Sequence, residues 1–471
     1  MQKTILIALL ACCCTSHAQD SSADYTQPWQ SQAHAILKAS IAFRTAQSFG
    51  EVPAFAEYLA TQFLAGGFSV DDVHVLPMVS DGEAVASLVV RYRGDGSSKR
   101  KPILFVAHMD VVDAPGQDWL TDPFTLSEEN GNFIGRGVLD DKVGTTLLTS
   151  TFLRLRDEGF VPTRDLVIAF TGDEESQMAT IQALTTQHMD LIYAEYAFVL
   201  DAGLGRLNDD FEPIADYVQV AEKTYATFEL TARNAGGHSA WPRPDNAIYD
   251  LADAIKAIQA FKFPAMSNAG TRAFFAESAG VMSGPTVDAM RRFANNPDDA
   301  EAIAILATVP AIDSLIRTTC VPTMLSGGHV ENALPQSATV TVNCRMFPGV
   351  EVGEIEATLR QVVDNADLEF KSLYESLSIP GTAPSPEVMS ALRNVIAQQY
   401  PGLAVIPEME SGATDATYLR LAGIPSYGTM GLFMREQDRL PHTANEFLPV
   451  RGFYSALEYW HLLIKELAGS N

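Results

Sequence analysis

Short apolar runs alternate with stretches of helical periodicity over the first 220 residues of the chain. Apolar residues recur at helical spacing over residues 28–45, 52–65 and 142–158, and Gly159 ends the last of these segments. Runs rich in Val, Ile, Leu and Phe predict strands at residues 84–92, 102–107, 166–171 and 196–200. This alternation is typical of an α/β layer with a mostly parallel central sheet.

The pattern changes near residue 222. The expected elements are a strand at 224–233, a helix at 246–261, strands at 319–325 and 338–345, a helix at 352–365 and a strand at 368–374. This β-α-β-β-α-β order predicts a ferredoxin-like domain. Residues 271–314, between its first helix and second strand, are expected to be additional helical material.

Three prolines, Pro380, Pro384 and Pro386, indicate a linker that returns to the first layer. Beyond residue 386, helix-like and strand-like segments alternate again. The expected organisation is therefore one α/β domain built from residues 19–221 and 379–471, with a smaller domain of residues 222–378 inserted into it.

Composition narrows the class of protein. Of the 471 residues, 47% are apolar and 19% charged, which favours a sizeable buried core over global disorder. The net charge of -26 disfavours a nucleic-acid or anionic-membrane partner, because both require a basic face.

The N-terminus has the features of an export signal. Lys3 is followed by an apolar run at residues 4–11 and by Ser16-His17-Ala18, so residues 1–18 are expected to be a signal peptide and the protein periplasmic or secreted. An alternative stays open, because Leu9-Leu10-Ala11-Cys12 also fits a lipoprotein signal that would place a lipid on Cys12. No later segment is long and apolar enough to cross a membrane.

Cysteines are sparse after the signal. Cys320 and Cys344 remain, and one disulfide or two buried thiols are both compatible with the sequence. Because the chain has no Cys-x-x-Cys motif, a thiolate zinc site is excluded.

Acidic residues and a histidine follow several of the expected strands. The side chains concerned are His108 and Asp110 after the second strand, the run 173–175 after the third, Asp201 after the fourth, and Asp140 with Asp141 at the start of a helix. Ligands of parallel sheets bind outside the carboxyl ends of the strands, so these groups are expected at one edge. Such an edge would repel itself unless cations neutralised it.

The donor types indicate the metal. Imidazole nitrogen with carboxylate oxygen, and no sulfur, suits catalytic zinc. Two zinc ions about 3.5–4 Å apart can share a bridging carboxylate and a water, and one further acid then carries the proton of that water to a leaving amine. The chemistry requires two histidines, three ligating carboxylates and one free carboxylate, a set that the chain offers if a late histidine completes it.

Six motifs occur in an order that resembles a known family. They are H-M-D at 108, G-R-G-V-L-D-D-K at 135, G-D-E-E-S at 172, V-L-D-A-G at 199, G-G-H-S at 236 and L-P-H-T at 440. From about residue 43 to the C-terminus, the chain is similar to the di-zinc amidohydrolases that include glutamate carboxypeptidase, aminoacylase, carnosinase and succinyl-diaminopimelate desuccinylase.

The resemblance implies a role for each polar residue of these motifs. The implied metal ligands are His108, Asp140 and Asp201 for one zinc, and Asp140, Glu175 and His442 for the second, with Asp140 bridging. Asp110 would orient His108, and Glu174 would be the general base. Asp173 receives no role beyond a solvated or capping residue.

The inserted domain would be the family's lid, through which members also dimerise. By the resemblance, His238 donates to the oxyanion, Arg345 grips a substrate carboxylate, Asn332 adds a polar contact and Gly412 belongs to a loop that lines the cleft. A homodimer through the lid and a monomer, in which the enlarged lid replaces a partner, both stay open.

One departure from the family pattern concerns a loop. The family usually has H-x-D-V-V-P, whereas in this chain Asp113 and Ala114 stand between Val112 and Pro115. The insertion follows the ligands, so it concerns the shape of the loop rather than metal binding.

The sequence thus predicts an exported di-zinc hydrolase of the carboxypeptidase or dipeptidase type, acting on a peptide or N-acyl amide bond next to a free carboxylate. Alternatives are an N-acyl-amino-acid amidohydrolase, a one-metal hydrolase or transferase acting on another acyl group, and a non-catalytic binding protein, which would have no need of Glu174.

Overall fold

The computed structural model describes residues 27–115, 118–373, 377–410 and 412–470. The expected signal peptide at residues 1–18 and the alternative lipid site at Cys12 lie outside the described residues.

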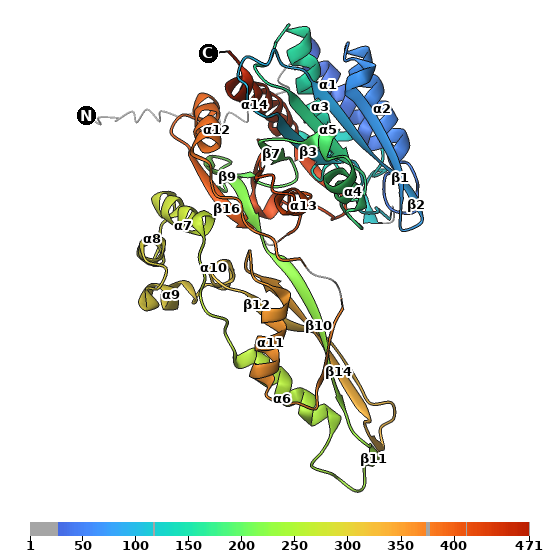
Figure 1. Cartoon of the computed structure of the whole chain (residues 1–471), viewed down its shortest axis with the longest axis vertical. Helices are drawn as coiled ribbons and strands as arrows, with labels where there is room; N and C mark the ends of the chain where they lie inside the picture. Colours follow the sequence, from blue (N-terminus) through green and yellow to red (C-terminus); the bar gives the residue numbers. More distant parts are fainter. Residues whose placement is uncertain (1–26, 116–117, 374–376, 411, 471) are drawn as a thin grey trace, which may run out of the picture.

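The larger part of the chain forms a ten-stranded mixed sheet, in the upper half of Figure 1. Its strands are β1 (Val73–Ser80), β2 (Glu83–Tyr92), β3 (Ile103–His108), β6 (Leu166–Thr171), β7 (Tyr196–Val199), β8 (Gly205–Leu207), β9 (Pro213–Glu222), β16 (Ala404–Glu410), β17 (Ser426–Gly428) and β18 (Phe433–Arg435). The order is β1-β2-β6-β3-β7-β17-β9-β8-β18, with β16 also paired to β9. The central run β6-β3-β7-β17 is parallel, which confirms the expected mostly parallel central sheet.

Both faces of this sheet are buried under helices. In β3, Ile103, Phe105 and Ala107 pack into the larger core, whereas Leu104 and Val106 pack into a second core on the other face. The larger core is closed by α1 (Pro28–Ala42), α2 (Val52–Ala65), α3 (Lys142–Asp157), α12 (Pro386–Gln399) and α14 (Val450–Ala468), and the second by α4 (Ala179–Gln187), α5 (Met189–Ile192) and α13 (Ala416–Leu421). Burial on both sides explains why the central strands are continuous apolar runs.

A second, antiparallel sheet forms the lower half of the molecule in Figure 1. Its strands are β10 (Thr224–Arg233), β12 (Thr319–Gly327), β14 (Ser337–Met346) and β15 (Glu369–Ser372), accompanied by helices α6 (Ala247–Ala260) and α11 (Val352–Val363). The order β12-β14-β10-β15 is that of the expected ferredoxin-like fold. We call residues 222–378 the lid, and we propose for it the boundaries expected from the sequence. The passage from β9 into β10, with only Lys223 between the two strands, supports the first boundary.

The lid has additional helices, and one of them contacts the main sheet. They are α7 (Ala269–Val281), α8 (Val287–Asn295), α9 (Ala300–Leu306) and α10 (Pro310–Leu315), which agrees with the helical material expected at residues 271–314. They share a core of their own, but α7 also packs on β16 and β9, where Phe274 meets Tyr217 and Ile406. The first of these helices, α7, therefore covers β16 and β9 of the main sheet.

Small ladders and one covalent link complete the described structure. β11 (Gly237–His238) pairs with β13 (Ala333–Leu334), and β4 (Ser127–Glu129), β5 (Asn132–Ile134) and β19 (Phe447–Pro449) form a three-stranded sheet. Cys320 and Cys344, register partners on β12 and β14, form a disulfide, which resolves the alternative that the sequence left open.

Among the described helices, none combines the length and apolarity needed to cross a membrane.

Candidate metal centre and active site

The parallel strands deliver polar side chains to one edge of the main sheet. His108 is the last residue of β3, and Asp201 follows the end of β7 by two residues. Glu174 and Glu175 follow β6, which pairs with β3 in parallel. Because β6, β3 and β7 are neighbours with the same direction, their carboxyl ends place these groups together.

Asp140 lies at the centre of the cluster. Its Oδ1 is 2.9 Å from Nε2 of His108, and its Oδ2 is 3.1 Å from Nε2 of His442. Asp201 Oδ1 lies 3.8 Å from the same nitrogen of His108, and Glu175 Oε1 lies 2.9 Å from that of His442. The side chains thus form two groups, each with its ligand atoms within 4.8 Å of one another, and Asp140 belongs to both.

Electrostatics show why this cluster suits cations. Burial raises the pKa of Asp201 to about 8, and hydrogen bonds with Asp140 and Glu175 raise the pKa of His442 to about 10. Protons are therefore held between the imidazoles and carboxylates, where divalent ions would take their place. With nitrogen and carboxylate oxygen donors and no sulfur, the residues present fit catalytic zinc.

Asp110 forms hydrogen bonds that position residues of the cluster. Its carboxylate accepts hydrogen bonds from the main-chain N–H groups of Glu174 and Glu175, each at 3.0 Å. Its carbonyl oxygen lies 3.0 Å from Nδ1 of His108. Asp110 therefore holds the acidic loop and the imidazole in one arrangement, which is what an orienting residue requires.

Glu174 lies beside the two metal-binding groups without belonging to either. Its side chain is buried, and burial together with the charge of Asp201 raises the pKa of its carboxyl well above the usual range. Cations in the neighbouring groups would favour the ionised form, so the position suits a proton acceptor.

The other acids of these motifs are helix caps. Asp173 is buried and accepts from the main-chain N–H groups of Thr180 at 2.8 Å and Ala179 at 2.9 Å, at the start of α4. Asp141 accepts from the N–H of Gly144 at 3.1 Å, at the start of α3. Asp173 is thus a capping residue, but it is not solvated.

The lid residues are separated along the lid sheet. Arg345 pairs with Tyr225 at the base of the sheet, beside the passage from β9 to β10. His238 lies in β11 and Asn332 directly precedes β13, at the end of the lid remote from the main sheet (Figure 1). From Tyr225 to Arg233 β10 alone spans roughly 27 Å, at about 3.4 Å per residue. The chain does not bring its own His238 and Asn332 to its metal centre.

Gly412 lies on a loop that reaches the metal centre from the main domain. Three residues later, Asp415 accepts a hydrogen bond of 2.5 Å from the hydroxyl of Thr171, the register partner of His108. Asp415 is buried, and burial raises its pKa to about 7. The sequence assigns no role to Asp415, because only the fold places it beside β6.

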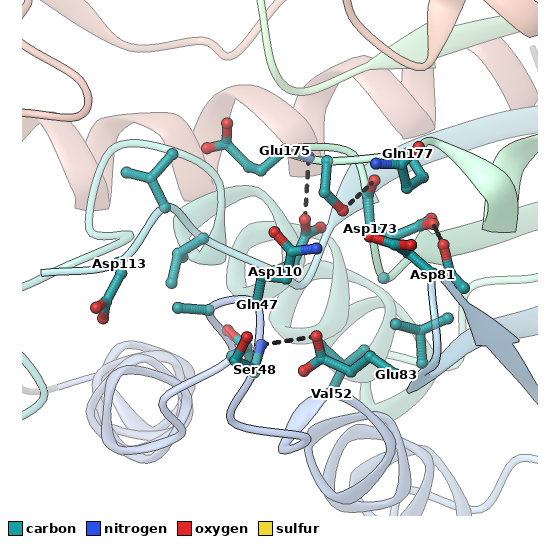
Figure 2. Close-up of a pocket in the computed structure, with 18 residues that line it drawn as sticks. Gln47, Ser48, Val52, Asp81, Glu83, Asp110, Asp113, Asp173, Glu175 and Gln177 are labelled. Carbon is teal, nitrogen blue, oxygen red and sulfur yellow. Dashed lines mark hydrogen bonds between the residues drawn. The ribbon is translucent and has the colours of Figure 1, made fainter.

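A cavity of 310 Å³ adjoins the metal centre. The segments that form it are the α1–α2 connection, the β1–β2 turn, residues 110–113 and the loop 172–177 (Figure 2). Glu175, which belongs to the second metal-binding group, also lines the cavity, as does Asp110. Asp113, which departs from the family pattern, accepts a hydrogen bond of 2.7 Å from Arg44 at the cavity wall, so the altered loop is tied to the α1–α2 connection.

The fold and the site define a metal-dependent hydrolase with an inserted lid. The chain belongs to Peptidase family M20/M25/M40, whose sequence model matches residues 104–466. It is therefore a metallopeptidase or amidohydrolase, as the ordered motifs predicted.

Curated relatives and solved structures agree with this family. The chain is 28% identical to probable carboxypeptidase S-like 2 of Dictyostelium discoideum over 80% of this chain and 74% of that protein. It is 26% identical to the human N-fatty-acyl-amino acid synthase/hydrolase PM20D1 over 78% of this chain and 74% of that protein. The fold is similar to that of aminopeptidase PepT from Bacillus cereus, with a TM-score of 0.64 at 17% identity, covering 93% of this chain and 98% of that one.

Proposed function

We propose that this enzyme hydrolyses a peptide or N-acyl amide bond next to a free carboxylate, with two zinc ions per chain. The observation that carries the proposal is the pair of overlapping groups, His108-Asp140-Asp201 and Asp140-Glu175-His442. Asp140 directs one carboxylate oxygen to His108 and the other to His442, and a ligand that bridges two metal ions requires this arrangement.

The residues around the ligands divide the chemistry between them. Bound zinc would lower the pKa of a water and polarise the scissile carbonyl. Glu174 would accept the proton of the attacking water and deliver it to the leaving amine, because its buried carboxyl lies beside the ligands and belongs to neither metal-binding group. Asp110 keeps the Glu174 backbone and the His108 ring in position throughout.

Arg345 is proposed to bind the free carboxylate of the substrate. It is exposed at the base of the lid sheet, with its guanidinium 5.7 Å from the centre of the Tyr225 ring. A guanidinium is suited to a carboxylate because its planar fork makes two parallel hydrogen bonds.

His238 and Asn332 are proposed to act on the metal centre of a second copy. Their position at the remote end of the lid prevents them from serving their own chain. The lid also has an unshared edge, because β12 is terminal in its sheet, and Val321, Met324 and Leu325 on it are 55%, 69% and 69% exposed. Exposed apolar edge strands pair readily with another strand, so we favour a homodimer through the lid over the monomer.

Export is supported by the disulfide between Cys320 and Cys344, since disulfides persist in oxidising compartments. We therefore retain the proposal of a periplasmic or secreted protein with residues 1–18 as its signal, and of Cys12 as the alternative anchor.

Two substrate classes share this chemistry. A carboxypeptidase or dipeptidase and an N-acyl-amino-acid hydrolase both release an amino acid whose carboxylate Arg345 would bind. The similarity to probable carboxypeptidase S-like 2 supports the first class, and the similarity to PM20D1, which is named for N-fatty-acyl-amino acids, supports the second.

The test is a hydrolysis screen of dipeptides, short N-acyl and long N-acyl amino acids, with zinc added or removed by a chelator. Each positive substrate is compared with its C-terminal amide. We expect zinc-dependent cleavage that is much faster for the free acids than for the amides. Equal cleavage of free acids and amides, or cleavage that survives complete zinc removal, would contradict the proposal.

A further inference from the structure

One buried ion pair next to the metal centre is not used by the proposed mechanism. Arg136 Nη1 lies 2.5 Å from Glu446 Oε2, and their side chains are 3% and 0% exposed. Arg136 stands four residues before Asp140, and Glu446 four residues after His442. The pair therefore joins the two segments that carry these ligands, although they are 310 residues apart.

The contacts of the pair reach the backbone on both sides of the Asp140–His442 contact. Glu446 Oε1 accepts from the main-chain N–H of Leu139 at 2.8 Å and of Asp140 at 3.2 Å. Arg136 Nη2 donates to the carbonyl of Thr443, the neighbour of His442, at 3.2 Å. One ion pair thus contacts the backbone at or next to both ligands.

The two metal-binding groups differ in how they are supported. His108 and Asp201 of the first group stand at the ends of adjacent paired strands, β3 and β7. In the second group, Asp140 and His442 stand on connecting segments, and the side chain of His442 is 50% exposed. The first group therefore has support from the sheet that the second lacks.

We infer that Arg136 and Glu446 are positioning residues that set the spacing of Asp140 and His442, and with it the zinc affinity of the second group. This inference rests on the proposed zinc binding. Neither residue touches the reacting atoms. The first group shares Asp140, but its other two ligands, His108 and Asp201, stand at the ends of paired strands, so it should retain its zinc.

The experiment measures zinc per chain by mass spectrometry after dialysis against graded concentrations of a competing chelator. Arg136→Met removes the charge and both hydrogen bonds, and Glu446→Gln keeps the shape of the acceptor but removes its charge. We expect both variants to fall from two zincs to one, with affinity for the second zinc weakened roughly tenfold or more. Arg136→Lys, which keeps the charge without the fork, should recover part of that affinity.

Arg164→Met is the matched control. Arg164 Nη1 also lies 2.5 Å from a carboxylate, that of Glu195, and its side chain is 1% exposed. It precedes β6 at the end of that strand opposite to Thr171, away from the metal centre. This control should lose stability in urea yet retain two zincs.

Retention of both zincs with unchanged affinity in Arg136→Met and Glu446→Gln would overturn the inference, and so would an equal loss of zinc in the control. If Arg136→Met does not fold, Glu446→Gln and Arg136→Lys decide. Wild-type protein that never binds a second zinc would instead refute the proposed metal centre itself, so the two failures are distinguishable.

Discussion

Subunit mixing is the sharpest test of the proposed composite active site. Glu174 lies on the main domain, whereas His238 lies at the remote end of a lid sheet in which β10 alone extends for roughly 27 Å. If His238 serves the neighbouring chain, each site of a homodimer combines Glu174 of one copy with His238 of the other. Glu174→Gln and His238→Ala variants would then be deficient alone but complementary when mixed.

The size of the effect follows from the symmetry of a dimer. Loss of an oxyanion donor costs about 10²–10³ in kcat, and loss of a general base about 10²–10⁴, so each variant alone should retain about 1% activity or less. Equal mixing with free exchange makes about half of the dimers mixed, and each mixed dimer has one intact site of two. Activity should therefore recover to about one quarter of wild type.

The assay uses two affinity tags to isolate mixed dimers after co-expression, where about half of wild-type activity is expected. The control pairs a wild-type chain with a chain carrying both substitutions, and this dimer should be nearly inactive because each of its sites lacks one group. The opposite pattern, an inactive mixture of single variants and a half-active control, would show that His238 serves its own chain and would refute the reasoning.

Three further outcomes are expected. Glu174→Gln should abolish turnover while two zincs per chain remain on metal analysis, and an active variant would show that the proton acceptor is another group. Arg345→Ala should raise KM for free-acid substrates roughly 10- to 100-fold, the worth of a charge-assisted hydrogen bond, without affecting C-terminal amides that are cleaved slowly; an equal effect on both would refute its role. Asp216 on β9 is buried without a hydrogen-bond partner among the described residues, and burial raises its pKa from 3.8 to about 8. Above about pH 4 the folded state therefore retains a proton that the unfolded state loses, so this group should lower the free energy of unfolding by about 2–3 kcal/mol between pH 5 and pH 7. Asp216→Asn should remove that loss in urea titrations of metal-free protein. Identical pH dependence of the two proteins would contradict this prediction.

Much of the local structure was predictable because it depends on neighbours in the chain. The helix Val52–Ala65 and the strands Leu166–Thr171 and Thr224–Arg233 have the expected bounds. Their apolar periodicity reports directly on burial at one or both faces. The residues that end the central strands were identified for the same reason, since a polar residue after a buried strand marks the sheet edge.

Two of the longer strands, β1 and β9, escaped prediction along with several short ones, and both are shaped by partner strands. β1 lies at the edge of the main sheet, where most of its side chains are only partly buried, so its periodicity is weak. β9 contains Asp216 in its core-facing register and is completed by β16, almost 200 residues later. Neither burial pattern is visible without the partner strand.

The sequence by itself determined the succession of α/β and ferredoxin-like segments and the chemical types available at the strand ends, because both arise from local periodicity and side-chain identity. Only the tertiary structure decided that Asp140 faces both His108 and His442, that Arg136 and Glu446 join segments 310 residues apart, and that α7 covers the main sheet. It also decided that His238 lies far from its own metal centre. The physical reason is that local patterns record whether a residue is buried, whereas distances between remote segments are set by how complete layers pack on one another.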